Sequence, residues 1–183
     1  MKNALIFHGT GCSPNSYWLP WLKNELEKEG YQVWIPSLPD SDKPDIKKWL
    51  PFVMENGTFS EETILIGHSA GWPFILSILE NIQLKVKQAI LVAGFSESLK
   101  TIDKEPILQA SYDWDKIQQH ANEFVFINSD NDPWGCDDKA GRKLQEHLGG
   151  RLIICKGQGH FGSDTYKQPY KEFPLLLKLI IRP

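Results

Sequence analysis

The pentapeptide Gly67-His68-Ser69-Ala70-Gly71 is the strongest chemical signal in the sequence. It follows an apolar run and precedes a segment with helical spacing, which is the context of a strand–turn–helix nucleophile elbow. Small flanking residues are needed there, because a β-carbon at either glycine would crowd so tight a turn. The motif predicts that Ser69 is a nucleophile for acyl transfer and that the Ala70 N–H, at the start of a helix, binds the oxyanion.

A serine hydroxyl attacks at neutral pH only when a base takes its proton, and the sequence offers five histidines for that role. His68 lies inside the elbow and points away from the nucleophile, His8 ends the first predicted strand, and His120 and His147 lie on helix surfaces. His160 occupies a glycine-rich loop directly after the last predicted strand. A chain order of nucleophile, acid and histidine places the base in that loop, so we predict His160 as the general base.

Two aspartates, Asp130 and Asp132, follow the penultimate predicted strand, where the acid that orients the histidine is expected. The spacing admits either of them, because an aspartate at a strand end also forms local turns. We favour Asp132 as the acid and Asp130 as the residue that forms the turn. Ser69, Asp132 and His160 then all lie at the carboxyl ends of strands, where open α/β sheets bind their ligands.

The loop after the first predicted strand supplies the second candidate oxyanion donor. Its small residues let a backbone N–H approach a substrate, with Thr10 as our first choice and Gly11 as the second. A phosphate-binding loop is disfavoured, because neither of the usual glycine-rich phosphate motifs occurs. Four aromatic residues lie beside the motifs and either wall the acyl pocket or belong to the core: Trp18, Trp72, Trp134 and Phe161.

Short apolar strands alternate with helical segments along the whole chain. The predicted strands are 4–7, 31–35, 63–66, 89–92, 124–127 and 152–155, and the predicted helices are 16–29, 45–55, 70–82, 114–120, 139–148 and 170–181. This alternation predicts an α/β fold, with a mostly parallel, doubly wound sheet of about six strands and helices on both faces. We expect residues 1–183 to form a single domain, in which the segment 95–112 leaves room only for a minimal lid.

The composition is that of an ordinary globular protein, with 41% hydrophobic and 23% charged residues in 183. A net charge of −3 disfavours a nucleic-acid or anionic membrane partner, and no apolar run approaches the roughly 18 residues of a membrane span. The three cysteines are too few and too scattered for a disulfide framework or a metal site. We therefore expect a cytoplasmic protein without a metal or an organic cofactor.

The sequence resembles the small serine hydrolase family that includes YdeN-like and retinoblastoma-binding-protein-type hydrolases. The likeness runs over almost the whole chain and is carried by His8-Gly9, Trp18-Leu19-Pro20-Trp21-Leu22, Gly67–Gly71, Ile90–Phe95, Asp130–Pro133 and Gly159-His160-Phe161. It implies a compact α/β-hydrolase fold, esterase-type activity, and a triad whose matching positions are Ser69, Asp132 and His160.

The expected reaction is hydrolysis of a small carboxylic ester through an acyl-enzyme, with a small-molecule substrate and no indicated protein partner. A thioesterase or a peptidase would use the same three residues, and the sequence does not separate them from an esterase. The alternative of a different class is a protein-binding module that keeps the fold without using the site. Labelling by a serine-directed fluorophosphonate separates that module from the enzymes.

Overall fold

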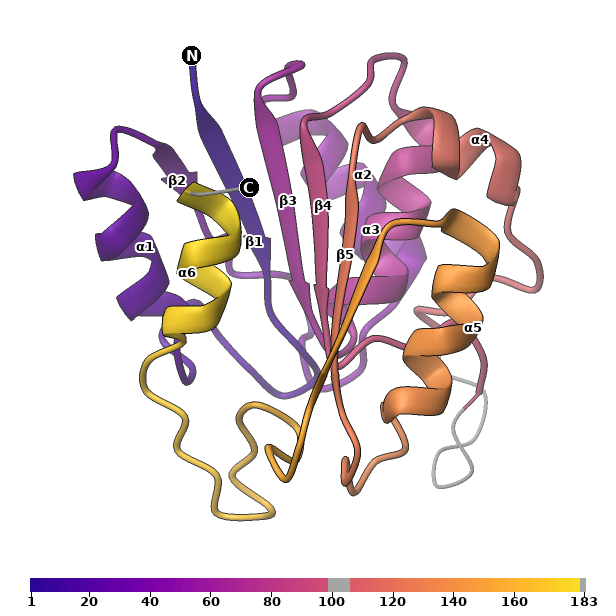
Figure 1. The fold of residues 1–183 in the computed structure, drawn as a ribbon. Helices are drawn as coiled ribbons and strands as arrows, with labels where there is room; N and C mark the ends of the chain where they lie inside the picture. Colours follow the sequence, from indigo (N-terminus) through magenta and orange to yellow (C-terminus); the bar gives the residue numbers. More distant parts are fainter. Residues whose placement is uncertain (99–105, 182–183) are drawn as a thin grey trace.

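The computed structural model describes residues 1–98 and 106–181. Six strands alternate with helices in it: β1 (Asn3–Phe7), β2 (Gln32–Trp34), β3 (Thr63–His68), β4 (Gln88–Val92), β5 (Phe124–Ser129) and β6 (Arg151–Cys155). They form one sheet in the order β2-β1-β3-β4-β5-β6, and all neighbouring strands in it are parallel (Figure 1). The expected parallel sheet of about six strands is confirmed.

The central strands are apolar on both sides, as a sheet covered by helices on both faces requires. Successive side chains of β3 alternate between two clusters: Ile64 and Ile66 belong to one, and Leu65 belongs to the other. The same alternation recurs along β1, β4 and β5. Burial on both faces explains why these runs lack the polar alternation of a half-exposed sheet.

Helices cover the two faces unequally (Figure 1). The first face carries α1 (Leu19–Lys28) and α6 (Pro174–Ile181), and the second carries α2 (Ile46–Asn56), α3 (Gly71–Asn81), α4 (Trp114–Gln119) and α5 (Asp138–Leu148). Aspartate side chains cap three of these helices by accepting hydrogen bonds from free N–H groups in the first turn, namely Asp45, Asp113 and Asp137. The prediction of helices on both faces is confirmed.

The last helix begins later than the sequence pattern predicts, at Pro174 instead of residue 170. Proline has no N–H and would clash with the preceding turn inside a helix, whereas the first turn accommodates it without loss. Tyr170, with φ of 36°, is also in a left-handed conformation that a helix excludes. Of the predicted minimal lid at 95–112, residues 99–105 lie outside the described residues, and the rest contains no helix.

The chain changes direction across the sheet between β1 and β3. After β1 it passes through α1 to β2 on one side, and after β3 it passes through α3 to β4 on the other side. Because α1 and α3 lie on opposite faces, the loops that follow β1 and β3 diverge. Doubly wound sheets bind ligands in the crevice at such a switch point, and here the crevice lies between the first loop and the Ser69 turn.

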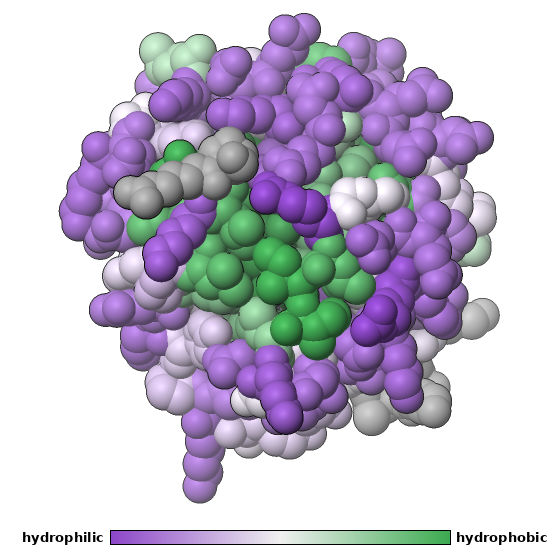
Figure 2. Space-filling view, in the orientation of Figure 1, coloured by the Kyte–Doolittle hydropathy of each residue, from purple (hydrophilic) through white to green (hydrophobic). Residues whose placement is uncertain are grey.

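The face bearing α1 and α6 is turned toward the viewer in Figure 1, and apolar side chains gather at its centre in Figure 2. Half-buried side chains of α6 and β6 pack on the core of this face, among them Ile153, Leu177 and Ile181. Within the described residues, none of the helices has the length and apolar character needed to cross a membrane.

Candidate active site

Ser69 adopts a left-handed backbone conformation, with φ of 54°, directly between β3 and α3. A non-glycine residue rarely adopts this conformation unless the surrounding structure imposes it. Here the backbone packs closely around the two glycines that flank the turn. A β-carbon at Gly67 would lie 2.6 Å from the Gly71 carbonyl oxygen, and one at Gly71 would lie 2.3 Å from the Phe7 carbonyl oxygen. The turn therefore has the geometry that its sequence predicts.

The first loop packs directly against this turn. A β-carbon at Gly9 would lie 2.9 Å from the Cβ atom of Ser69 and 3.4 Å from its hydroxyl oxygen. Only glycine leaves room for such contact, which brings the backbone of residues 9–11 beside the serine hydroxyl. Residues 9–12 and Ser69 accordingly line one cavity.

His160 and Asp132 form a buried pair, with 2.7 Å between His160 Nδ1 and Asp132 Oδ2. The second carboxylate oxygen of Asp132 accepts the backbone N–H of Trp134 at 2.8 Å, which fixes the plane of the carboxylate. A carboxylate can only accept, so its contact with Nδ1 places a proton there and leaves Nε2 of neutral His160 as the atom that can take a proton.

The loop that carries His160 is held by side chains from the loop after β5. Three consecutive N–H groups of the His160 loop donate to three consecutive side chains: Gly157 to Asp130 at 2.7 Å, Gln158 to Ser129 at 3.0 Å and Gly159 to Asn131 at 2.8 Å. Asp130 lies in the turn after β5, as expected, and its side chain in addition joins two loops by its bond to Gly157, 27 residues away. Asp132 makes a local bond as well, to the N–H of Trp134.

The carbonyl side of the same loop is held by two buried rings. His68 Nε2 lies 2.8 Å from the His160 carbonyl oxygen, and Trp18 Nε1 donates to the Phe161 carbonyl at 2.9 Å. Burial lowers the pKa of His68 to about 3, with the neighbouring His160 acting in the same direction. The His68 imidazole is therefore neutral near pH 7.

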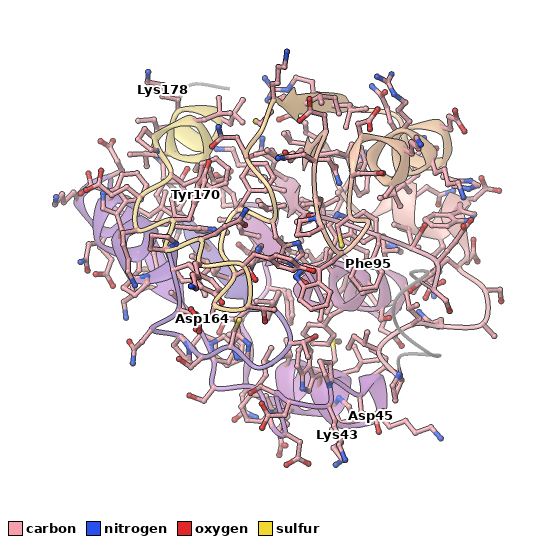
Figure 3. The ribbon with its side chains drawn as sticks, turned by 90° about the horizontal axis from the view of Figure 1, so that it is seen from below. Lys43, Asp45, Phe95, Asp164, Tyr170 and Lys178 are labelled. Carbon is pink, nitrogen blue, oxygen red and sulfur yellow. The ribbon has the colours of Figure 1, made fainter. Side chains whose placement is uncertain are left out.

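Ser69 and His160 line a common cavity of about 570 Å³ at the carboxyl ends of the strands. This is the usual size of a small-molecule site. Figure 3 looks onto this edge of the sheet and shows Phe95 near the middle, with Lys43 and Asp164 further out on different sides. The lining residues include both apolar and polar side chains around Ser69 and His160.

The four aromatic residues that the sequence places near the motifs divide into one that lines the cavity and three that lie in the core. Trp134 lines the cavity. The other three, Trp18, Trp72 and Phe161, are fully buried in the core and are not among the lining residues. Nearness in the chain did not determine their direction: Trp18 faces the underside of the His160 loop, and Trp72 packs on Gly94.

Several wall residues have no counterpart in the sequence analysis. Tyr17, Cys12 and Asp164 form one part of the wall, where the Tyr17 hydroxyl accepts the backbone N–H of Asp164 at 3.1 Å. Burial raises the pKa of Tyr17 to about 12 and also raises the pKa of the Cys12 thiol. Both groups are therefore neutral near pH 7. Cys12 lies in the first loop, and Tyr17 lies in the turn before α1, which begins at Leu19 and not at the predicted residue 16. Helical spacing therefore did not mark Tyr17 as a wall residue.

One group of three potential metal ligands is found within the described residues. Ligand atoms of Asp132, Cys136 and His160 all lie within 4.8 Å of one another, and all three residues are buried. The aspartate and histidine atoms are already hydrogen-bonded to each other at 2.7 Å. The arrangement is thus accounted for by an acid–histidine pair with a cysteine beside it.

A doubly wound parallel sheet with a serine on a left-handed turn after β3 places the molecule among the α/β hydrolases. Comparison with known families is more specific, since a model described as serine hydrolase matches residues 4–179. The chain belongs to this serine hydrolase family.

Individual relatives agree with that assignment. YdeN of Bacillus subtilis is 33% identical over 170 residues, which are 89% of this chain and 87% of that protein. The serine hydrolase RBBP9 of Rattus norvegicus is 25% identical over 164 residues, 88% of this chain and 87% of that protein. The crystal structure of the B. subtilis ydeN product matches with a TM-score of 0.88 at 29% identity, covering 98% of this chain and 97% of that one.

Proposed function

We propose that the chain hydrolyses small carboxylic esters, with Ser69 as nucleophile, His160 as general base and Asp132 as the acid that orients His160. One observation carries the proposal: Ser69 and His160 line the same cavity, and His160 is paired with Asp132 behind it. Ser69 would attack the ester carbonyl while His160 Nε2 accepts its proton, and the alcohol would leave with that proton. Water activated by His160 would then release the acid from the acyl-enzyme.

The oxyanion of this reaction would bind the backbone N–H groups of Thr10 and Ala70. In the described part of the chain, neither of these N–H groups donates a hydrogen bond to the protein. Their neighbours are engaged: Gly11 donates to Ser41 at 2.8 Å, and Ser69 donates to Val92 at 3.0 Å. The engaged Gly11 favours Thr10 as the first-loop donor.

The proposal treats residues 1–183 as one catalytic domain that needs no metal or organic cofactor. Trp134 and Phe95 supply apolar wall to the cavity, which suits an acyl or alkoxy group. We also propose a cytoplasmic location, because three scattered cysteines suit a reducing compartment. Thioesters and amides are the competing substrates, since the same residues would attack them.

Fluorophosphonate labelling with an ester, thioester and amide panel tests the proposal. Ser69→Ala should lose labelling and turnover, because removal of the nucleophile of a serine protease lowers kcat by about 10⁶. Ser163→Ala is the matched control, since Ser163 lines the same cavity but its hydroxyl already accepts the Tyr166 N–H. The control should keep its labelling and most of its activity. A Ser69→Ala protein with more than about a tenth of wild-type kcat would exclude this nucleophile.

Acyl-chain length should also decide turnover. Because the length of the segment 95–112 predicts only a minimal lid, we expect the highest kcat/KM on acyl groups of about two to six carbons, since each further methylene gains about 0.8 kcal/mol only if it is buried. A series of p-nitrophenyl esters measures this. An optimum at about ten carbons or longer would contradict the short-chain preference, while leaving the triad intact.

A further inference from the structure

The peptide carbonyl of His160 joins the base loop to the nucleophile turn. His68, the residue before Ser69, contacts this oxygen through Nε2 at 2.8 Å. A carbonyl oxygen only accepts hydrogen bonds, so His68 Nε2 carries the proton and donates it. The two residues are 92 positions apart, so no local turn holds them together.

Packing alone does not call for a histidine at this position. The His68 ring is fully buried and lies among the rings of Tyr17, Trp18 and His160, with centroids 6.0, 5.8 and 5.1 Å away. A phenylalanine would also place an aromatic ring in the core, and it has no ring nitrogens. Buried ring nitrogens are unfavourable unless they are hydrogen-bonded. Because His68 stays neutral, it donates to the loop without placing a second positive charge beside the His160 imidazolium that forms in acyl transfer.

We propose that His68 is a positioning residue that sets the distance between the Ser69 hydroxyl and the His160 imidazole. The inference rests on the proposed function, because it gives His68 a part in the same acyl transfer. Apart from bonds within the loop itself, the other described hydrogen bonds of this loop reach the loop after β5, Gln168, Tyr170 or Trp18. The His68 bond reaches the nucleophile turn.

The expected size of the effect follows from the geometry of proton transfer. Nucleophile and base act together only at hydrogen-bond distance, about 2.6–3.2 Å between heavy atoms. A displacement of about 1 Å in such a pair lowers the rate on the order of 10²-fold. His68 is one of the residues that line the cavity, but it is buried, so most of the wall that a substrate contacts is left unchanged and KM should change little.

The test compares two substitutions at His68 with a control at a distance. His68→Phe removes the donor and keeps a buried aromatic ring, whereas His68→Gln keeps an N–H donor on a side chain of similar reach. Trp49→Phe is the control, because Trp49 is also fully buried and donates to a backbone carbonyl, that of Pro39 at 2.8 Å, outside the cavity. Urea unfolding midpoints of all three variants show whether each one folds and how much stability it loses.

We expect His68→Phe to lower kcat about 10²-fold with KM within about threefold, and His68→Gln to recover at least about tenfold of that loss. Trp49→Phe should keep wild-type kcat at a comparable loss of stability. The positioning role is overturned if His68→Phe keeps kcat within about threefold of wild type, if glutamine and phenylalanine are equally impaired, or if the control loses as much kcat as His68→Phe.

A spectroscopic readout separates this inference from the proposed function. The proton shared by His160 Nδ1 and Asp132 should give a downfield proton NMR resonance that His160→Ala lacks. His68→Phe should shift or broaden this resonance, and His68→Gln should restore it. If wild-type protein hydrolyses no ester and takes no fluorophosphonate label, the proposed function fails, and the resonance still decides whether His68 positions His160. An unchanged resonance in His68→Phe overturns the inference.

Discussion

Asp132 uses its two carboxylate oxygens for two different partners, the imidazole of His160 and the backbone N–H of Trp134. The second bond holds the carboxylate in the plane that the first one needs. Asp130, two residues earlier, uses one oxygen to hold the Gly157 N–H and is exposed. The two aspartates that the sequence could not separate by spacing thus differ in what they hold: one holds a ring and the other a backbone group.

Amidation of these two side chains should therefore give unequal losses. Asp132→Asn presents an amide to Nδ1 and favours the wrong tautomer of His160, which lowered kcat about 10⁴-fold in a serine protease triad. Asp130→Asn keeps a carbonyl-type oxygen for the Gly157 N–H, so it should stay within about threefold of wild type. Steady-state kcat on a short-chain ester measures both. If Asp130→Asn loses as much kcat as Asp132→Asn, the assignment of Asp132 as the acid is wrong.

At the scale of elements, the nucleophile depends on how closely α3 approaches β1. The α3 backbone begins at Gly71, where a β-carbon would lie 2.3 Å from the Phe7 carbonyl oxygen. The gap is closed by backbone on both sides, so no flexible side chain can move aside. Gly71, two residues after the nucleophile, is thus required by helix–strand packing, independently of any role in the chemistry.

Gly71→Ala should accordingly destabilise the whole fold. Overpacking of a core costs about 1–3 kcal/mol, and a backbone-to-backbone clash lies at the upper end. Gly30→Asn is the matched control, since Gly30 has φ of 81°, nothing lies within 4 Å of an added β-carbon, and asparagine tolerates this conformation. Urea unfolding measures both variants. Equal unfolding free energies for Gly71→Ala and wild type would show that α3 can move away from β1.

The elements were largely predictable from sequence, and the directions of single side chains were not. Short apolar strands that alternate with segments of helical spacing mark the elements clearly. Whether a tryptophan next to a motif faces a cavity or the core depends on which side of its own element it occupies. Trp72 packs on Gly94, where a β-carbon would lie 2.2 Å from its Nε1, and this pairing of residues 22 positions apart leaves no periodic pattern.

At the scale of the whole molecule, buried neutral histidines link stability to pH. Burial lowers the pKa of His68 to about 3 and also lowers the pKa of His8, whereas an unfolded chain gives a histidine a pKa of about 6.5. Between these values the unfolded chain binds more protons than the folded one. The free energy of unfolding therefore rises with pH across this window and falls as pH drops below about 6.5.

The pH dependence of unfolding should show the contribution of His68. Each histidine of this kind adds up to about 1.4 kcal/mol per pH unit to the slope within the window. Urea unfolding of wild type at pH 7, 6 and 5 should give a steep fall, and His68→Gln, which cannot be protonated, should give a shallower one. Equal slopes for the two proteins would mean that His68 is already accessible to protons in the folded state.

The order in which these parts meet has a consequence for folding kinetics. The Asp132–His160 pair and its loop-to-loop bonds join segments 27 to 29 residues apart, within one strand–helix–strand unit. The His68 bond to the base loop spans 92 residues and closes a far longer loop, which costs more chain entropy. A refolding chain would assemble its acid–histidine unit early and join it to the nucleophile last. The recovery of enzymatic activity during refolding would then report when this last, longest-range contact forms.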